Sequence, residues 1–345
     1  MKYIINGKFL TQSLSGVQRY AIELTKGLVN LGLDVIIAVP NVPLQDKRLF
    51  NKQLKIIGKR NGVYWEQLEL PRFVKSTDRV LINFANSAPL FLKNQLITIH
   101  DLGVYFNPNW YKWKFVVWYK LMTPIIAKRA SLIFTVSKTA KSELQNILGI
   151  EAEKICVAYN GVSAQFDPQK AILPKENIIL HVGTFSKRKN VELIEKAFIQ
   201  ASIQHYKLIF VGRKDDNLSF ESSSLNAASI EILTDVSDAQ LHELYQKSKI
   251  LISASHYEGF GLPVLEGLVH QNWAIISDIP VYRELYSQGV RFFDPNNVQD
   301  LSEQLKKIVN EDQLFPSEYS DAYMESYSYE KSSKLVWKAL GNKAN

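Results

Sequence analysis

Two glutamates in a glycine-bearing segment carry the strongest chemical signal in this sequence. Glu258 and Glu266 are separated by seven residues and follow the apolar run 250–253, which predicts a buried strand. A strand that passes through a glycine loop into a helix places backbone N–H groups and the positive end of the helix beside any bound anion. The two carboxylates could then hold different hydroxyl groups of one extended ligand. The alternatives are a turn with solvated glutamates, or a dinucleotide-binding turn, which Val264 at the third glycine position matches poorly.

A second segment, residues 181–190, combines a glycine turn with three consecutive cations. Gly183 follows an apolar run, and the cations at 187–189 come just before a predicted helix. Cations at the start of a helix oppose its dipole, so an anionic ligand would compensate them. The alternative interpretation is a solvated basic loop.

Short β-branched runs alternate with amphipathic segments along the whole chain, a pattern typical of parallel sheets covered by helices. The predicted strands are residues 3–5, 35–39, 80–82, 96–99 and 132–136, then 178–182, 208–211, 230–233, 250–253 and 274–276. The sequence therefore predicts an α/β protein with two doubly wound, Rossmann-like domains. We place the first domain at 1–163, a linker at 164–177, the second domain at 178–318, and a helical tail at 319–345 that packs back toward the first domain.

Composition limits the class of protein. The chain has 345 residues, of which 46% are hydrophobic, enough for two cores of roughly 150 residues each. The net charge of +7 favours anionic partners, and the single Cys156 excludes a disulfide framework and a cysteine-based zinc site. The apolar run within the first residues is too short for a signal peptide. No stretch of the sequence approaches the roughly 20 consecutive apolar residues that span a bilayer. We expect a cytoplasmic protein that at most rests on the inner face of the cytoplasmic membrane.

In these motifs the chain resembles glycosyltransferase family 4, the group 1 retaining glycosyltransferases of GT-B type, over nearly its whole length. The two glutamates and the glycine-to-lysine loop are the most specific matches. Weaker matches in the same order are Gly16 within 15–17, His100 with Asp101, residues 135–137, Asn160 within 159–162, and residues 211–213. The resemblance implies two Rossmann-like domains that face a central cleft, and transfer of a sugar from a nucleotide diphosphate with retention at the anomeric carbon.

The resemblance also implies roles for individual residues. Lys189 would contact the donor diphosphate, Glu258 the donor sugar, and Glu266 the ribose. Gly16 would allow the first-domain loop to approach the reacting sugar closely. The expected sets are His100, Lys189 and Glu258 for catalysis; Gly16, Gly183, Arg188, Lys189, Glu258, Phe260, Gly261, Leu262 and Glu266 for donor binding; and Gly16, His100, Asp101 and Asn160 on the acceptor side.

Several of these positions leave alternatives open. His100 could instead be a histidine hydrogen-bonded at a strand end, and Asp101 and Asn160 could be turn formers. The chain also departs from the family pattern at two positions. Many members have Arg at the position of Thr184, and some have at the position of Pro263 a residue whose N–H can donate to phosphate. Arg188 would replace the missing cation.

The implied reaction needs neither a cofactor nor a bound metal. The chain has no Asp-x-Asp motif, the usual metal holder of the other main glycosyltransferase fold, and fixed cations with helix N-termini can stabilise a leaving diphosphate. We expect transfer of a hexosyl residue from a GDP- or UDP-linked donor to a lipid-linked glycan in cell-surface polysaccharide or lipopolysaccharide synthesis. The alternatives are a GT-B nucleotide-sugar epimerase or hydrolase and a non-catalytic binding subunit. No motif for nucleic-acid recognition is present.

Residues 102–142 contain no acidic residue. Their cations are Lys112, Lys114, Lys120, Lys128, Arg129, Lys138 and Lys141, interleaved with Trp110, Tyr111, Trp113, Trp118 and Tyr119. Such a segment could lie on an anionic membrane surface. The alternative is an ordinary helix of the first domain with Trp113, Val117 and Leu121 as its core stripe.

Overall fold

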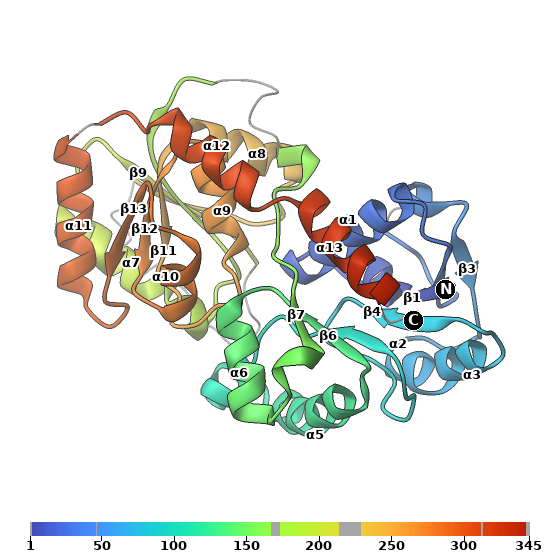
Figure 1. Cartoon of the computed structure of the whole chain (residues 1–345). Coiled ribbons are helices and arrows are strands. Elements are labelled where there is room, and N and C mark those ends of the chain that lie inside the picture. The colour runs from blue at the N-terminus through green and yellow to red at the C-terminus, as the bar shows by residue number, and fades with distance from the viewer. Residues whose placement is uncertain (1, 46, 167–172, 214–228, 312, 343–345) are drawn as a thin grey trace. The chain divides into compact units, whose positions relative to one another are not determined.

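The computed structural model describes all residues except 1, 46, 167–172, 214–228, 312 and 343–345. The chain forms two compact units, one made of Met1–Gly161 and Ser328–Asn345 and the other of Val162–Tyr327. Each unit is built on a parallel β-sheet with helices packed against it (Figure 1). The predicted α/β class with two doubly wound, Rossmann-like sheets is therefore confirmed.

The sheet of the first unit has the order β3-β2-β1-β4-β5-β6-β7 within the described residues, and its neighbouring strands are parallel. All five strands predicted in this half are present, whereas β3 and β7 were not predicted. The strands are β1 (Tyr3–Asn6), β2 (Val35–Val39), β3 (Leu54–Ile56), β4 (Val80–Asn83), β5 (Leu96–Thr98), β6 (Leu132–Thr135) and β7 (Ile155–Val157). The strand order reverses between β1 and β4, where doubly wound sheets bind their ligands.

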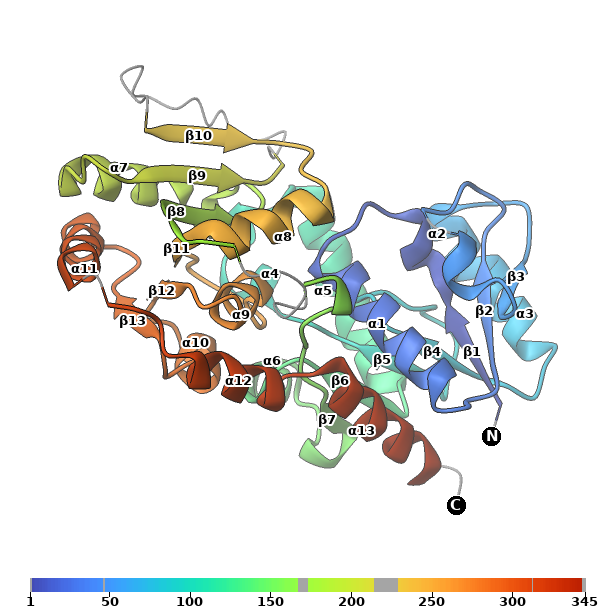
Figure 2. The same cartoon turned by 90° about the horizontal axis from the view of Figure 1, so that it is seen from above.

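Helix α1 (Gly16–Asn30) follows β1 and packs along the C-terminal helix α13 (Tyr329–Asn342) (Figure 2). A Cβ atom at Gly27 would lie 2.0 Å from Oγ of Ser333, so glycine lets the two helices come this close. The other helical segments of this unit include α2 (Gly62–Tyr64), the π-helical turn η3 (Trp65–Glu69), α3 (Leu70–Lys75), α4 (Gly103–Phe106), α5 (Trp113–Arg129) and α6 (Lys138–Leu148).

Helix α5 corrects one expectation. The stripe expected as core is exposed, with 71% of Trp113, 50% of Val117 and 62% of Leu121 accessible to solvent. The buried face of α5 is instead formed by Tyr119, Met122, Thr123, Ile126 and Ala127, whose apolar members pack with strands β5 and β6 in one core cluster. Because 113, 117 and 121 share a helical period, the sequence could not tell which of two apolar stripes faces the sheet.

The sheet of the second unit has the order β10-β9-β8-β11-β12-β13 among the described residues, again with parallel neighbours. Its strands are β8 (Glu176–Val182), β9 (Lys207–Val211), β10 (Ile230–Leu233), β11 (Ser248–Ser253), β12 (Trp273–Ser277) and β13 (Val290–Phe293). Its helices are α7 (Val191–Ala201), α8 (Asp238–Lys247), α9 (Leu262–Val269), α10 (Pro280–Leu285), α11 (Val298–Glu311) and α12 (Ser317–Ser326). The order reverses between β8 and β11, so the loops after these two strands meet at the switch point.

The segments that join the units differ from the expected boundaries. Strand β8 begins at Glu176, inside the expected linker, and residues 167–172 of that linker lie outside the described residues. Helix α12 packs on α9, where the hydroxyl of Ser320 donates to the carbonyl of Val269 at 2.7 Å. Only the chain from Ser328 onward belongs to the first unit, so the expected tail is divided between the two units. In the described part of the chain, no helix combines the length and apolar character needed to cross a membrane.

Candidate active site

The loops after β8 and β11 bring the two motifs of the second unit together. The turn after β8 carries the 3-10 helix η8 (Lys187–Lys189), and the loop after β11 carries Glu258. The two loops are joined through the backbone, since the N–H of His256 donates to the carbonyl of Arg188 at 2.9 Å. A carboxylate and two cations predicted from separate motifs therefore form one cluster at the switch point.

Glu258 is the centre of this cluster and is only 8% exposed. Its Oε1 accepts hydrogen bonds from the ammonium of Lys189 and from the hydroxyl of Ser255, the latter at 2.7 Å. Its Oε2 accepts from the guanidinium of Arg188 at 3.0 Å, and the same nitrogen of Arg188 donates to the carbonyl of Tyr257 at 2.7 Å. The two cations and one carboxylate leave a surplus of one positive charge.

The environment keeps Glu258 ionised. Burial alone would raise the pKa of its carboxyl group, but the charges of Lys189 and Arg188 and the hydrogen bonds from Lys189 and Ser255 lower that pKa to about 2. Lys189 is itself buried, so its ammonium is held against the carboxylate with little access to water. A buried carboxylate held in this way can accept hydrogen bonds from the hydroxyl groups of a ligand, while the cations face its anionic part.

Gly183 lies beside the stem of Lys189. A Cβ atom at this position would lie 3.4 Å from Cε of Lys189, an ordinary van der Waals contact. Next to it, Nδ1 of His181 lies 3.0 Å from the carbonyl of Ile252, and because a carbonyl only accepts, Nδ1 carries the proton. Thr184, where many family members have Arg, is exposed.

The start of helix α9 lies directly after the Glu258 loop. The helix begins at Leu262, and Gly261 precedes it with φ of +87°, in the left-handed region. A Cβ atom at Gly261 would lie 2.4 Å from Cε1 of Tyr282, so this glycine is required both by its backbone and by its neighbour. Phe260 is buried against the rings of Tyr286 and Tyr327. At the start of α9, Pro263 has no N–H group and the N–H of Val264 donates to the carbonyl of Gly261 at 2.9 Å, so only part of this helix start can donate to an anion.

Glu266 lies one turn inside α9 and is buried. Its Oε2 accepts a hydrogen bond of 2.8 Å from the hydroxyl of Tyr245 on α8. The ring of His270 is stacked on that of Tyr245, with 5.4 Å between the centroids. The second glutamate of the pair is thus held by residues different from those that hold the first.

Among the expected residues of the first unit, His100 packs against Tyr20, which lies on α1 one turn after the exposed Gly16. The ring of His100 contacts Tyr20 edge to face at 4.8 Å, and its Nε2 lies 2.9 Å from the carbonyl of Phe84. Burial lowers the pKa of His100, against the smaller opposing effects of that carbonyl and of Asp101. His100 therefore has the strand-end hydrogen bond of the alternative interpretation, which does not test a role in catalysis.

Asp101 and Asn160 both have partners within the first unit. Oδ1 of Asp101 accepts from the N–H of Gly103 at 3.0 Å, which closes the turn into α4. Oδ1 of Asn160 accepts from the hydroxyl of Tyr329 at 3.3 Å. These contacts match the turn and structural alternatives for both residues, and their acceptor-side roles stay predictions.

Three site residues were not predicted. Ser255 lies within the glutamate motif, three residues before Glu258, so its spacing could have indicated it. Tyr282 contacts the hydroxyl of Ser253 at 2.7 Å and Tyr245 bonds Glu266, but each comes from another helix, α10 or α8. No local spacing in the sequence links these tyrosines to the motif.

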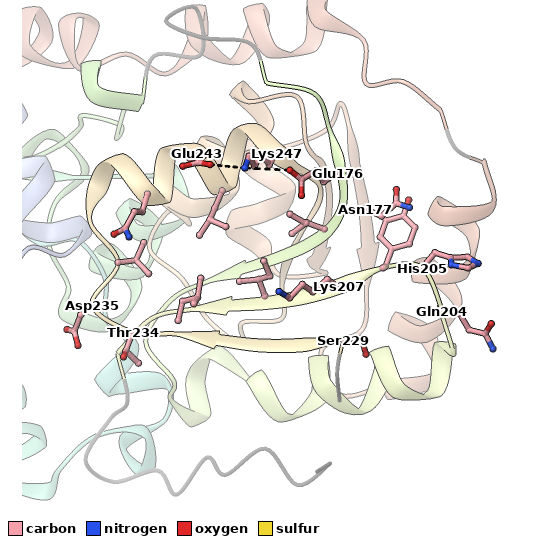
Figure 3. Close-up of a pocket in the computed structure, with 17 residues that line it drawn as sticks. Glu176, Asn177, Gln204, His205, Lys207, Ser229, Thr234, Asp235, Glu243 and Lys247 are labelled. Atoms are coloured by element: carbon pink, nitrogen blue, oxygen red, sulfur yellow. Dashed lines mark ion pairs between the residues drawn. The ribbon is translucent and has the colours of Figure 1, made fainter. Parts of the chain in front are cut away.

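A hollow of about 800 Å³ lies elsewhere on the second unit, along β8, β9, β10 and helix α8 (Figure 3). Its rim carries Lys247, which is ion-paired with Glu243 and Glu176. None of the described residues that line it is one of the expected site residues. This hollow is therefore separate from the Glu258 cluster.

Comparison with known proteins places this chain in a family. The sequence model of the glycosyl transferases group 1 matches residues 163–330, and that of Glycosyltransferase Family 4 matches residues 14–166. The O-antigen chain mannosyltransferase RfbU of Salmonella typhimurium is 30% identical over 272 residues, which cover 75% of this chain and 74% of that protein.

A further relative resembles the chain in sequence, and a solved structure resembles it in fold. A GDP-mannose:cellobiosyl-diphosphopolyprenol alpha-mannosyltransferase of Xanthomonas oryzae is 26% identical over 218 residues, or 59% of this chain and 55% of that protein. The crystal structure of Anabaena HepE in complex with UDP and glucose has the same fold, with a TM-score of 0.74 at 14% identity and 99% coverage of both chains. Sequence matches to both halves and the shared GT-B fold lead to one conclusion: the chain belongs to the group 1 glycosyltransferases of family 4 and is a glycosyltransferase.

Proposed function

We propose that the protein is a retaining, metal-independent hexosyltransferase that uses a nucleotide diphosphate sugar, with GDP-mannose as the first donor to test. The observation that carries the proposal is the buried Glu258 between Lys189 and Arg188 at the switch point of the second unit. The names of the relatives RfbU and the Xanthomonas enzyme favour a mannosyl donor, and the latter names GDP-mannose.

The charges of the cluster suit such a donor. Lys189 and Arg188 supply fixed positive charge to the leaving diphosphate, and the start of α9 adds its dipole, so a bound metal is not required. Glu258 would accept hydrogen bonds from sugar hydroxyl groups, and Glu266 from the ribose. In a retaining transfer the bond from the anomeric carbon to phosphate breaks, the acceptor oxygen bonds to the same face, and a phosphate oxygen takes the acceptor proton.

The test measures nucleotide release and product configuration. With GDP-mannose, UDP-glucose and UDP-galactose as donors, we expect release of the nucleoside diphosphate from GDP-mannose and not from the two UDP-sugars, and only when a glycan acceptor is present. The new linkage, read by NMR of its anomeric proton and carbon, should keep the α configuration of the donor. Equal release with and without acceptor would instead indicate a hydrolase or epimerase, and a β-linked product would overturn retention.

The acceptor that we propose is a lipid-linked glycan at an anionic membrane surface. Support comes from the exposed side of α5, where Trp113, Val117, Trp118 and Leu121 form an apolar face. Exposed cations border it at Lys112, Lys114, Lys120 and Lys128. Apolar side chains beside cations, with no acid from 102 to 142, match an anionic lipid surface on the cytoplasmic side.

Vesicle binding tests this surface. Each basic side chain near an anionic bilayer contributes about 1 kcal/mol, so the wild type should sediment with phosphatidylglycerol vesicles at low salt and dissociate at high salt. Neutral phosphatidylcholine vesicles should not bind it. Changing Lys112, Lys114 and Lys120 to Gln should weaken binding, whereas changing Lys306 and Lys307 on α11 to Gln is the matched control. No sedimentation of the wild type at low salt would overturn the membrane proposal and leave the donor proposal standing.

A further inference from the structure

A buried ion pair lies at the switch point of the first unit, apart from every residue discussed above. Glu66 of η3 is only 2% exposed, and its Oε2 accepts from the ammonium of Lys8 at 2.9 Å. Its Oε1 accepts from the amide of Asn6 at 2.9 Å and from the hydroxyl of Ser87 at 2.7 Å. Asn6 ends β1, and its amide also donates to Oδ1 of Asn83, which ends β4, at 3.0 Å.

The position of this cluster points to ligand binding. The ends of β1 and β4 are where the strand order of the first sheet reverses, and ligands of doubly wound sheets bind outside such strand ends. Glu66 lies on a π-helical turn between α2 and α3, and π turns inserted in helices occur often at functional sites. Apolar residues in place of Lys8 and Glu66 would stabilise the fold at least as well as this buried ion pair, so stability alone does not account for the pair.

The free hydrogen-bonding capacity lies on the exposed side of the cluster. The side chain of Lys8 is 15% exposed, and among the described residues its ammonium donates to Glu66 alone. An ammonium has three N–H groups, so it can donate to a ligand as well. Ser87 is partly exposed, and its hydroxyl donates to Glu66, which leaves its oxygen able to accept.

We propose that Lys8 and Ser87 bind hydroxyl groups of a neutral sugar, the terminal residue of the acceptor glycan, and that Glu66 is their positioning residue. Lys8 and Glu66 cancel in charge, so the cluster does not select an anion. The ammonium donates to one hydroxyl oxygen while the serine oxygen accepts from a hydroxyl group, a pairing that suits neighbouring hydroxyls of a pyranose. This inference rests on the proposed glycosyl transfer, because that function supplies the sugar acceptor.

The experiment measures sugar binding without a donor. Binding of methyl α-D-mannopyranoside, methyl α-D-glucopyranoside and methyl α-D-galactopyranoside to the full chain is followed by ligand-observed NMR. Wild type should bind at least one of them, and Lys8→Met, which keeps the length of the side chain, should weaken that binding about tenfold. Ser87→Ala should weaken it less. Lys26→Met is the matched control, since Lys26 forms an ion pair with Glu23 on α1 of the same unit, and it should bind as wild type does.

Kinetics separate this inference from the proposed function. With the bound glycoside as acceptor, Lys8→Met and Glu66→Gln should raise its KM about tenfold and leave the KM for the nucleotide sugar unchanged. A folded Lys8→Met or Ser87→Ala protein with wild-type sugar binding, or a wild type that binds none of the three glycosides, would overturn the inference. Sugar binding that depends on Lys8, without transfer from any donor, would overturn the proposed function alone.

Discussion

The hydroxyl of Tyr245 donates a hydrogen bond of 2.8 Å to Oε2 of Glu266, and both residues are buried. Tyr245 comes from α8 and Glu266 from α9, so the carboxylate is oriented by an element outside its own helix. The proposal assigns Glu266 to the ribose of the donor, which makes Tyr245 a positioning residue for donor binding.

Changing Tyr245 to Phe tests this relationship. Removing one hydrogen bond of about 1 kcal/mol should raise the KM for the nucleotide sugar five- to tenfold and change kcat less than twofold. Tyr319→Phe, on α12 of the same unit, is the control and should leave both constants unchanged. Equal losses of kcat and kcat/KM would instead place Tyr245 in the reaction step.

Changing Glu258 to Gln should lower turnover by at least about a hundredfold, or about 2.7 kcal/mol of transition-state stabilisation. The isosteric amide keeps the shape of the loop but leaves Lys189 and Arg188 without their carboxylate. We expect a folded protein by circular dichroism. Glu243→Gln, which removes an exposed carboxylate from α8, is the control. Near-normal turnover of Glu258→Gln would remove this residue from the site.

Activity should persist in excess EDTA, whereas Lys189→Ala should abolish most of it. The ammonium is proposed to neutralise the leaving diphosphate, a task that a metal performs in other enzymes. Lys187→Ala, in the same turn but exposed, is the matched control and should retain activity. Loss of wild-type activity in EDTA, with recovery on adding magnesium or manganese, would contradict the metal-independent mechanism.

Changing Gly261 and Gly32 to Ala, one at a time, distinguishes the effect of backbone strain from that of a steric clash. Both have positive φ, +87° and +81°, so a change to Ala imposes roughly 1 to 2 kcal/mol of backbone strain at either position. Only at Gly261 would the new Cβ also meet Tyr282, because nothing lies within 4 Å of a Cβ at Gly32. Gly261→Ala should therefore lower the free energy of unfolding more than Gly32→Ala, and it alone should weaken donor binding. Equal losses would show that the Tyr282 contact relaxes.

The second unit should lose stability in mild acid through His181. Burial lowers the pKa of this histidine to about 4, with the Ile252 carbonyl, Lys189 and Glu258 as smaller, partly opposing effects. The unfolded chain takes up the proton near pH 6.5, so the contribution is fully present above that pH and is lost as the pH falls toward 4. Urea unfolding at pH 7 and pH 4.5 should differ by about 2 to 3 kcal/mol more in wild type than in His181→Gln. Identical pH dependence in the two proteins would show that His181 is not buried as a neutral base.

The sequence predicted those parts of the fold that depend on long apolar runs. All ten predicted strands are present, and most of them have the uninterrupted apolar run that burial on both faces needs, whereas the edge strand β10 is only partly buried. Strands β3 and β7 have three residues each, and β13 is only partly buried, so their runs are too short or too polar to be distinctive. The core stripe named in one of the two alternatives for α5 is exposed, because the helix has apolar residues nearly all round and tertiary packing decides which side is buried.

Some residues of the candidate site could likewise be predicted from the sequence, and others could not. Lys189 and Glu258 were both expected at the donor site, because the resemblance to the family implied it, and the structure brings their side chains into contact. Tyr245 and Tyr282 come from helices far from these motifs in the sequence, and only the folded chain brings them to Glu266 and Ser253. The Glu66 cluster draws on three separate segments, none of which has a recognisable spacing.

The first unit is discontinuous, since its last helix α13 is separated from the rest by the whole of the second unit. During synthesis, residues 162–327 are translated before the segment that covers α1. The second unit is continuous in sequence and can fold as one domain, whereas the first unit needs α13 to complete its packing. A chain cut after Tyr327 would expose the surface of α1 around Gly27 that Ser333 covers, and it would also lose the partner of Asn160. Helix α13 therefore completes the packing of a unit that begins far earlier in the chain, and a product truncated before α13 leaves the side of α1 around Gly27 uncovered.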